Sequence, residues 1–201
     1  MGIHLMPPLF ELVIRPKPTV TFNAIAAANL SYQRYGADYP DVHNGAGMES
    51  NAVAHIRQIK NINNIYDVFR YPGGWDTSSI GSGSLIQSAH MRCRLQGKDT
   101  SDGHDNLIIV SGAGLVFGIA DYLTLLSAVT SFGSINTADL PAVGEYFNIP
   151  LNSLGLAAIN KTGTTLLGLR MGRDISATPP AGTDLRIWVY LYGFPTLEIA
   201  Y

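Results

Sequence analysis

The clearest alternation of hydrophobic and polar positions follows Ser88. Every second residue is apolar, and the polar residues between them include His90 and two arginines; the apolar set is Ala89, Met91, Cys93 and Leu95. Successive side chains of a strand point to opposite faces of a sheet, so this spacing predicts a strand with one core face and one solvent face. A preceding strand from Arg70 is expected to end at Trp75, and a turn at Asp76 joins the two. We assign structural roles to Arg70, Trp75 and Asp76, with Trp75 in the core.

The same period of two returns toward the C-terminus. Apolar positions alternate over 167–171 and 185–191, and Leu197, Ile199 and Tyr201 fall on one side of the closing segment 195–201. Further strands are expected over 52–59, 65–71 and 107–110. Many short strands without alternating helices predict an all-β fold, a two-layer antiparallel β-sandwich that is jelly-roll-like.

Three segments depart from the strand pattern. Residues 32–47 are rich in Gly, Asn, Asp and Tyr and predict a long irregular loop. Helical spacing over 120–129 and a candidate cap at Ser153 before 153–159 predict one or two short helices. Pro72, Gly73 and Gly74 before Trp75 predict a bulge or a widened loop beside the turn.

Residues 1–19 form an extended N-terminal arm or an edge strand in this interpretation, and 20–201 form a single domain. Phe10, Leu12 and Ile14 alternate with other residues between prolines at 7, 8, 16 and 18, which suits a segment lying along another surface. The start has no basic region before an apolar one, so we expect no signal peptide. The most apolar stretch, 115–129, falls short of the ~20 residues that span a bilayer, so no membrane span is expected.

The low fraction of charged residues bears on what the protein's surface contacts. Charged residues are 14% of the chain, against about 25% in ordinary soluble domains, while 46% are hydrophobic. Such a chain is expected to cover much of its outer surface with a partner. The net charge is −2 and the 13 basic residues are scattered, so nucleic acid is not an expected partner.

The sequence holds no arrangement typical of an enzyme or a cofactor site, so we predict a non-enzyme without cofactor. Cys93 lies on the inward face of its strand and is expected to be a buried apolar residue. The glycines at 112, 114 and 118 lack the spacing and the βαβ context of a dinucleotide loop. The five histidines lack metal-type spacing. Asp99, Asp102 and Asp105 are candidate calcium ligands, although a solvated turn is the preferred interpretation.

Two groups of aromatic residues are candidates for binding. Trp188, Tyr190 and Tyr192 fall on one face of a predicted strand, and the second group, Tyr32, Tyr35 and Tyr39, falls in one predicted loop. Flat rings stack on sugars, but aromatic residues also build protein interfaces. Both ligand binding and subunit contact are therefore open, and contact with the second layer or with a subunit is preferred.

The order of several short motifs resembles a known family. The run from Arg70 to Leu95, with its turn Asp76-Thr77-Ser78-Ser79-Ile80, resembles the DNRLRE-type carbohydrate-binding-module-like β-sandwiches of phage structural proteins and bacterial surface proteins. The later segments 160–165, 169–170 and 195–201 resemble that family's closing strands, so the likeness covers roughly 20–201. The family places Phe before the Asp of the turn, whereas this chain has Trp75 after two glycines.

This resemblance implies two functions. The first is a structural or attachment protein of a virion, such as a phage capsid decoration, head or tail component. It would assemble in the host cytoplasm as a homo-oligomer, a trimer being favoured, and contact other virion proteins. The alternative is a carbohydrate-binding module that mediates surface adhesion by binding glycans. The absence of a signal peptide in the sequence favours the first.

Overall fold

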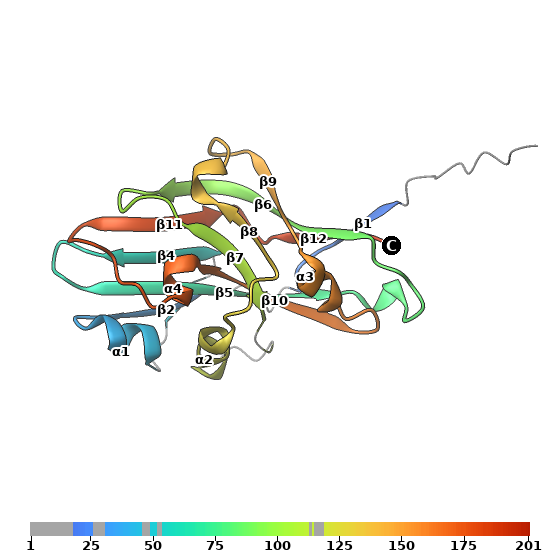
Figure 1. Cartoon of the computed structure of the whole chain (residues 1–201), viewed down its shortest axis with the longest axis horizontal. Helices are drawn as coiled ribbons and strands as arrows, with labels where there is room; N and C mark the ends of the chain where they lie inside the picture. Colours follow the sequence, from blue (N-terminus) through green and yellow to red (C-terminus); the bar gives the residue numbers. More distant parts are fainter. Residues whose placement is uncertain (1–17, 26–30, 46–48, 52–53, 113, 115–118) are drawn as a thin grey trace, which may run out of the picture.

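The protein is described from a computed structural model that covers residues 18–25, 31–45, 49–51, 54–112, 114 and 119–201. The fold is all-β, and every strand pair in these ranges is antiparallel (Figure 1). The strands are β1 Thr19–Phe22, β2 Ser31–Gly36, β3 Glu49–Asn51, β4 His55–Lys60, β5 Tyr66–Asp76, β6 Ser88–Asp99, β7 Asn106–Ser111, β8 Gly133–Asn136, β9 Tyr146–Pro150, β10 Thr164–Met171, β11 Leu185–Leu191 and β12 Thr196–Ala200.

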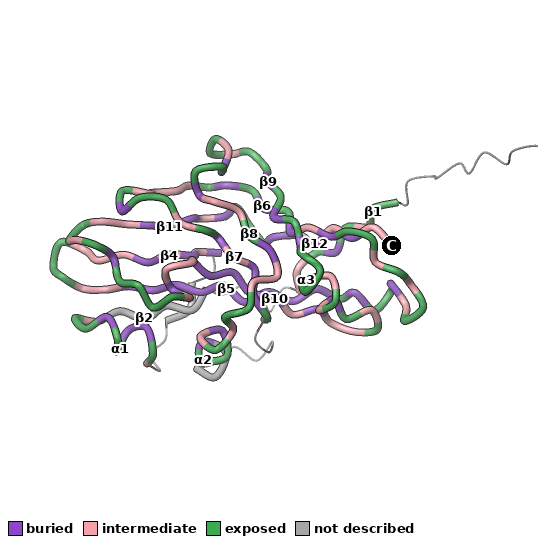
Figure 2. Tube along the Cα trace, viewed as in Figure 1, coloured by how far each residue is buried: buried purple, intermediate pink, exposed green. Residues whose placement is uncertain are grey.

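The strands form two layers that share strand β5. The continuous order is β1-β12-β6-β11-β4-β5-β10-β7-β8, with β9 on the free side of β6 and β2 on β5. The first part of β5 pairs with β4 through Phe69, and the second part pairs with β10 from Tyr71 onward. Strand β5 thus passes from the layer of β4, β11 and β6 into the layer of β10, β7 and β8 (Figure 1). This passage explains why β5 is buried along nearly its whole length (Figure 2).

The core lies between the two layers and confirms the main alternation in the sequence. Cys93 and the other predicted inward residues of β6 are buried, and they pack with apolar residues of the opposite layer such as Leu167 and Leu169. Trp75 is fully buried in the same cluster, where its indole Nε1 donates to the Pro195 carbonyl at 3.0 Å. The predicted two-layer β-sandwich is therefore correct.

The predicted irregular loop at 32–47 is wrong. Strand β2 occupies its first part and pairs with β5, and helix α1, Tyr39–Asn44, occupies the next. Pro40 stands at the start of α1, a position where a missing N–H costs no hydrogen bond. Tyr39 and Val42 of the helix pack on Val68 of β5. Tertiary packing thus orders a segment whose composition is typical of a loop.

Short helices are more numerous than the one or two predicted. In the described ranges, α1 is joined by α2 Ile119–Ser127, α3 Ser153–Ala157 and α4 Gly172–Ile175, with single 3₁₀ turns at Ser78–Ile80 and Thr137–Asp139. The predicted cap of α3 is off by one residue, because the side chain of Asn152, not Ser153, accepts from the Gly155 N–H at 3.0 Å. None of the helices in these ranges is long and apolar enough to cross a membrane.

Strand β10 is buried on both faces, although its alternating pattern resembles that of a strand with one solvent-exposed face. Gly168 and Arg170 alternate with the core residues of β10, yet both are buried. Helix α2 covers them, and a Cβ at Gly168 would lie 2.4 Å from Leu125 Cδ2. The glycine therefore lets α2 lie directly on the outer side of β10.

The predicted bulge at Pro72, Gly73 and Gly74 is absent from the structure, where these residues continue the regular ladder opposite 166–168. Gly73 lies under the Trp75 ring, and a Cβ there would be 2.4 Å from Cη2 of the indole. The glycine serves the packing of Trp75 rather than a break in pairing.

Residues 1–19 are predicted to form an arm or an edge strand. Positions 1–17 of this segment lie outside the described residues, and Thr19 begins the edge strand β1.

Candidate functional site

An aromatic surface lies on the outer side of β11, β4 and β5. Trp188 pairs with Arg57, Tyr190 with His55, and Arg57 in turn with Phe69. Residues opposite each other in an antiparallel ladder share one face of the sheet. These five residues, which we call the outer aromatic face, therefore lie together on the side of β4 away from Ile56 and the core.

The rings of the outer aromatic face are stacked in a row. The Trp188 and Tyr190 ring centroids are 4.2 Å apart with planes inclined by 24°, and those of Tyr190 and His55 are 3.8 Å apart and inclined by 19°. Gly97 of β6 lies beside Tyr190, and a Cβ there would be 2.9 Å from Trp188 Cζ3. The absence of a side chain at position 97 is thus what allows Trp188 to lie flat.

Arg57 holds this row to the next strand. Its guanidinium lies 4.0 Å above the Phe69 ring, donates to the Tyr190 hydroxyl at 2.9 Å and pairs with Asp67. Burial and the charge of Arg57 lower the pKa of His55 to about 4. His55 is therefore neutral at physiological pH, and its ring stacks as an uncharged aromatic surface.

The outer surface continues onto β6 and β9 with arginines between tyrosines. Arg94 lies 4.9 Å from the Tyr192 ring centroid and 5.7 Å from that of Tyr146, and Arg92 lies 4.2 Å from Tyr146. Tyr146 is 58% exposed and Tyr192 is 45% exposed. Arg92 also pairs with Glu198 at 3.3 Å. This half of the surface offers rings and guanidinium groups to solvent together.

The structure separates the six aromatic candidates. Trp188, Tyr190 and Tyr192 follow one another along the outer surface, as the sequence pattern predicts. Tyr39 is 6% exposed and accepts from Gln58 Nε2 at 2.7 Å, so its selection as a surface candidate is wrong. Tyr32 and Tyr35 lie on β2, opposite Arg70 and Asp67, and their side chains are outside the described part. The sequence did not indicate the contribution of His55, Arg57 or Tyr146.

The three candidate calcium ligands bind different protein donors. Asp102 accepts from Arg173 Nη1 at 2.5 Å, and Asp105 Oδ2 accepts from the Arg173 N–H at 2.9 Å. Asp99 accepts from the Ser101 N–H at 2.9 Å, as in a turn. Across the residues that the structure describes, no three His, Cys, Asp or Glu side chains are grouped so that they could hold a metal ion.

A buried ion cluster lies where β5 changes layer. Arg70 donates to both Asp174 oxygens at 2.8 and 2.7 Å, and Arg170 Nε donates to Asp174 at 2.6 Å. All three side chains are at most 1% exposed. Burial would raise the pKa of Asp174, but the hydrogen bonds and charges of the two arginines outweigh it and lower that pKa to about 2.

Helix ends complete this cluster. Arg170 Nη1 donates to the carbonyls of Leu125 and Ala128 near the end of α2 at 2.8 and 3.0 Å, where the helix dipole is negative. His43 Nε2 of α1 donates to the Asp174 carbonyl at 2.6 Å. The cluster therefore attaches α1, α2 and α4 to the sheet. Because its charged groups are paired with one another and with backbone carbonyls, we assign the cluster, Arg70 included, a structural role.

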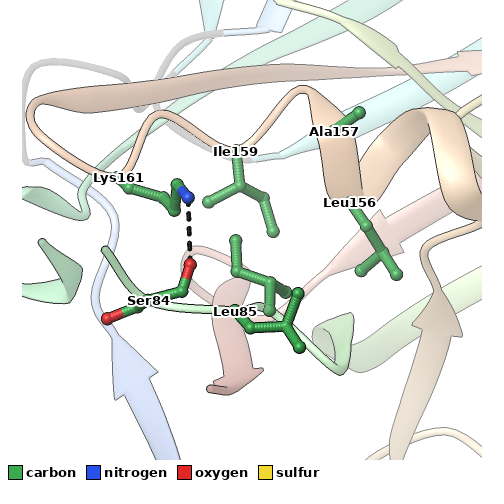
Figure 3. Close-up of a pocket in the computed structure, with 7 residues that line it drawn as sticks. Ser84, Leu85, Leu156, Ala157, Ile159 and Lys161 are labelled. Carbon is green, nitrogen blue, oxygen red and sulfur yellow. Dashed lines mark hydrogen bonds between the residues drawn. The ribbon is translucent and has the colours of Figure 1, made fainter. Parts of the chain in front are cut away.

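An apolar pocket of about 270 Å³ lies between residues 84–86 and the segment 156–161, which begins in α3. Figure 3 shows Leu85, Leu156 and Ile159 around it, with Lys161 at its rim. Lys161 Nζ donates to the Ser84 carbonyl at 2.9 Å and joins the two walls (Figure 3). The volume is below the ~300 Å³ from which small-molecule pockets begin.

The fold and its surfaces define an all-β protein with an outer face of rings and arginines. Comparison of the sequence with models of known protein families finds no match, and comparison with curated proteins finds none either. The likeness to DNRLRE-type modules therefore depends on the short motifs alone and stays a prediction.

Proposed function

We propose that this chain is a structural or attachment protein of a virion, such as a phage capsid decoration, head or tail component, and that it assembles as a homo-oligomer without catalysing a reaction. Jelly-roll-like sandwiches of antiparallel strands are common in viral capsid proteins and lectins. A rigid sandwich suits such a role because it presents a fixed surface to its neighbours.

The observation that carries this proposal is the outer surface of β11, β4, β6 and β9. This surface holds stacked and partly exposed rings with arginines beside them. Aromatic residues and arginine are among the residue types most enriched in protein interfaces. A low charged fraction of 14% agrees with a chain that covers part of this surface on assembly. The favoured assembly is a trimer, formed in the host cytoplasm, whose other partners are proteins of the same particle.

The non-enzymatic assignment is supported by the state of the reactive groups. Cys93 is the single cysteine of the chain, and burial raises the pKa of its thiol well above the ordinary value. Asp174 and His43 are occupied in the buried ion cluster. The buried groups of Cys93, Asp174 and His43 thus serve packing and internal pairing.

The alternative is a carbohydrate-binding module for surface adhesion. Tyr146 and Tyr192 favour it, because both rings are about half exposed and flank Arg94. Exposed flat rings stack on the apolar faces of sugars, and guanidinium groups donate to hydroxyl or carboxylate oxygens. On this alternative the chain would bind glycans as a monomer.

Light scattering on the full chain separates the two proposals. A stable trimer or another closed oligomer is expected for the virion protein. Replacing both exposed rings, Tyr146→Glu with Tyr192→Glu, is expected to dissociate the oligomer, because charge would replace apolar contact area. Leu123→Glu on α2 is the matched control, since Leu123 is 37% exposed on the helix that covers the other layer.

A carbohydrate-binding module predicts a different result in these experiments. A monomer that binds a glycan array, and loses that binding in the double tyrosine variant but not in Leu123→Glu, would support the carbohydrate-binding module. A monomer that binds no glycan would contradict both functions. Detection of the chain in purified particles is the direct test of the virion assignment.

A further inference from the structure

Arg94 of β6 differs from the other arginines in its pairing. Every other arginine whose side chain the structure describes forms an ion pair with an aspartate or a glutamate: Arg57, Arg70, Arg92, Arg170, Arg173 and Arg186. Arg94 is exposed, and the described residues, the exposed Glu145 included, place no carboxylate within ion-pair distance of it. Its charge is therefore available to an anionic ligand.

One backbone contact orients the Arg94 guanidinium. Its Nε donates to the Gly144 carbonyl at 2.8 Å. In the described part of the protein Nη1 and Nη2 donate to no other group, and these two nitrogens stand side by side in the guanidinium plane. A carboxylate accepts two parallel hydrogen bonds from such a pair, which adds geometric selection to the attraction of charge. The group is thus oriented to receive a carboxylate.

Tyrosine rings flank Arg94 from the two neighbouring strands. Arg94 lies opposite Tyr146 in the ladder of β6 and β9. Tyr192 follows β11, and its N–H donates to the Arg94 carbonyl at 2.8 Å. The guanidinium lies 5.7 Å from the Tyr146 ring centroid and 4.9 Å from that of Tyr192. A ligand bound to Arg94 would therefore meet an exposed ring on either side, and we call these three residues the Arg94 row.

A second row on the same face adds polar groups. Arg92 pairs in the sheet with Asn148 of β9 and with Thr196 of β12, and residues opposite each other share one face. Asn148 is exposed. The charge of Arg92 is offset by Glu198 at 3.3 Å. This row therefore supplies amide and hydroxyl groups, while the unpaired cation belongs to the Arg94 row.

We propose that this surface binds an acidic glycan, with the carboxylate of a uronic or sialic acid residue on Arg94 and a sugar ring stacked on Tyr146 or Tyr192. Sugars combine an apolar face, which stacks on flat rings, with hydroxyl groups that reach neighbouring amide and hydroxyl groups. The inference rests on the proposed attachment function and names the chemical class of its ligand.

A sugar suits the Arg94 row better than a protein side chain does. The centre of a protein interface is depleted in charge and closely packed, and its rim is polar and solvent-accessible. In the Arg94 row a guanidinium separates the two rings, and the pair Arg92 and Glu198 lies beside it. In a homo-oligomer that makes contact through Trp188 and Tyr190, this row would lie at the rim, within reach of a glycan.

A glycan array with matched acidic and neutral members tests the proposal. It carries oligogalacturonate beside its methyl ester and sialyllactose beside its methyl ester, so each pair differs in the carboxylate alone. The full chain is expected to bind at least one acid about tenfold or more tightly than its ester, because a hydrogen-bonded charge pair is lost in the ester. The pair that shows this preference identifies the kind of acidic sugar.

Variants of Arg94 assign the preference to this site. Arg94→Gln is expected to weaken binding of the acid about tenfold or more and to leave binding of the ester unchanged. Arg94→Lys, which keeps the charge but not the planar pair of donors, should recover part of the loss. Arg186→Gln is the matched control, because it removes the same charge from an exposed arginine that is already paired with Asp184. It should bind both forms like the parent chain.

Several outcomes would overturn the inference. These are equal binding of acids and esters, the absence of binding to any acid on the array, and equal effects of Arg94→Gln and Arg186→Gln. Dissociation of an oligomer by Arg94→Gln in light scattering would overturn it too, since the row would then be a contact with a protein subunit.

Oligomeric state and glycan binding are separate measurements, so this inference and the homo-oligomer can fail independently. An oligomer that binds no acidic glycan would contradict the inference and leave the virion proposal standing. A monomer that binds an acidic glycan through Arg94 would contradict the homo-oligomer and support the inference.

Discussion

At the scale of single residues, the buried charges of Arg70, Arg170 and Asp174 decide where the helices lie. Two cations share one carboxylate. Carbonyls at the end of α2 accept from Arg170 Nη1, and the Asp174 carbonyl accepts from Arg170 Nη2. Buried ion pairs compensate the cost of desolvation only with such full pairing. The cluster therefore depends on all its partners at once.

Asp174→Asn is expected to lower the free energy of unfolding by about 3 to 5 kcal/mol, because it leaves two buried arginines without an anion. The pKa of Asp174 is lowered to about 2, so its stabilising contribution is complete above its ordinary pKa of 3.8 and is lost as pH falls toward 2. Urea unfolding between pH 2 and 6 measures both effects.

The control is Asp184→Asn, which removes the exposed partner of Arg186. Exposed pairs contribute ~0–1 kcal/mol, so this variant should unfold nearly like the parent chain. Equal losses in the two variants, or an acid-induced loss of stability that persists unchanged in Asp174→Asn, would contradict the role of the cluster.

Trp75 provides a second residue-scale prediction. Trp75→Ala should cost about 3 to 5 kcal/mol, since it removes a fully buried ring and leaves a cavity over Gly73. Thermal unfolding monitored by circular dichroism checks it. Phe194→Ala, at a ring that is 38% exposed one residue before the Pro195 acceptor, is the control and should change stability far less. An unchanged melting transition in Trp75→Ala would refute its place in the core.

At the scale of elements, strand patterns were readable and short helices were not. The period of two in β6 predicted its core face correctly because that strand has one wet side. Helix α1 has six residues, too few for a helical pattern to be stable alone, and Tyr39 and Val42 are ordered by packing on Val68. Sequence composition therefore indicated a loop where the fold holds a helix.

The cap of α3 is a direct test at this scale. Asn152→Ala is expected to cost about 1 kcal/mol, because its side chain accepts from the Gly155 N–H and donates to the Ser131 carbonyl at 2.8 Å. Ser153→Ala, at the neighbouring exposed residue that the sequence suggested as the cap, should be nearly neutral. Chemical denaturation of the two variants decides between the positions, and the reverse order of effects would contradict the observed cap.

At the scale of the whole molecule, closure of the sandwich depends on strands distant in sequence. Strand β12 lies between β1 and β6, and its residues Leu197 and Ile199 are fully buried. The Trp75 indole also donates to Pro195, just before this strand. The last strand thus links the first strand to the centre of its layer.

Removal of 195–201 is therefore expected to abolish cooperative folding. Two buried side chains and two ladders of hydrogen bonds would be lost together. Loss of the β-type circular dichroism spectrum and of a sharp melting transition is the expected measurement. Removal of 1–17 is the control and should leave the transition of the individual sandwich in place; a stable fold without β12 would contradict this topology.

The sequence by itself determined the all-β class, the inward residues of β6, the core position of Trp75 and the row Trp188, Tyr190 and Tyr192, because local alternation on a pleated strand sets which face each side chain takes. Only the tertiary structure decided that β5 serves both layers, that Arg70 meets Asp174, and that His55, Arg57 and Tyr146 join the aromatic surface. These features depend on which strands pair. Pairing is set by contacts between residues far apart in the chain, which no local pattern records.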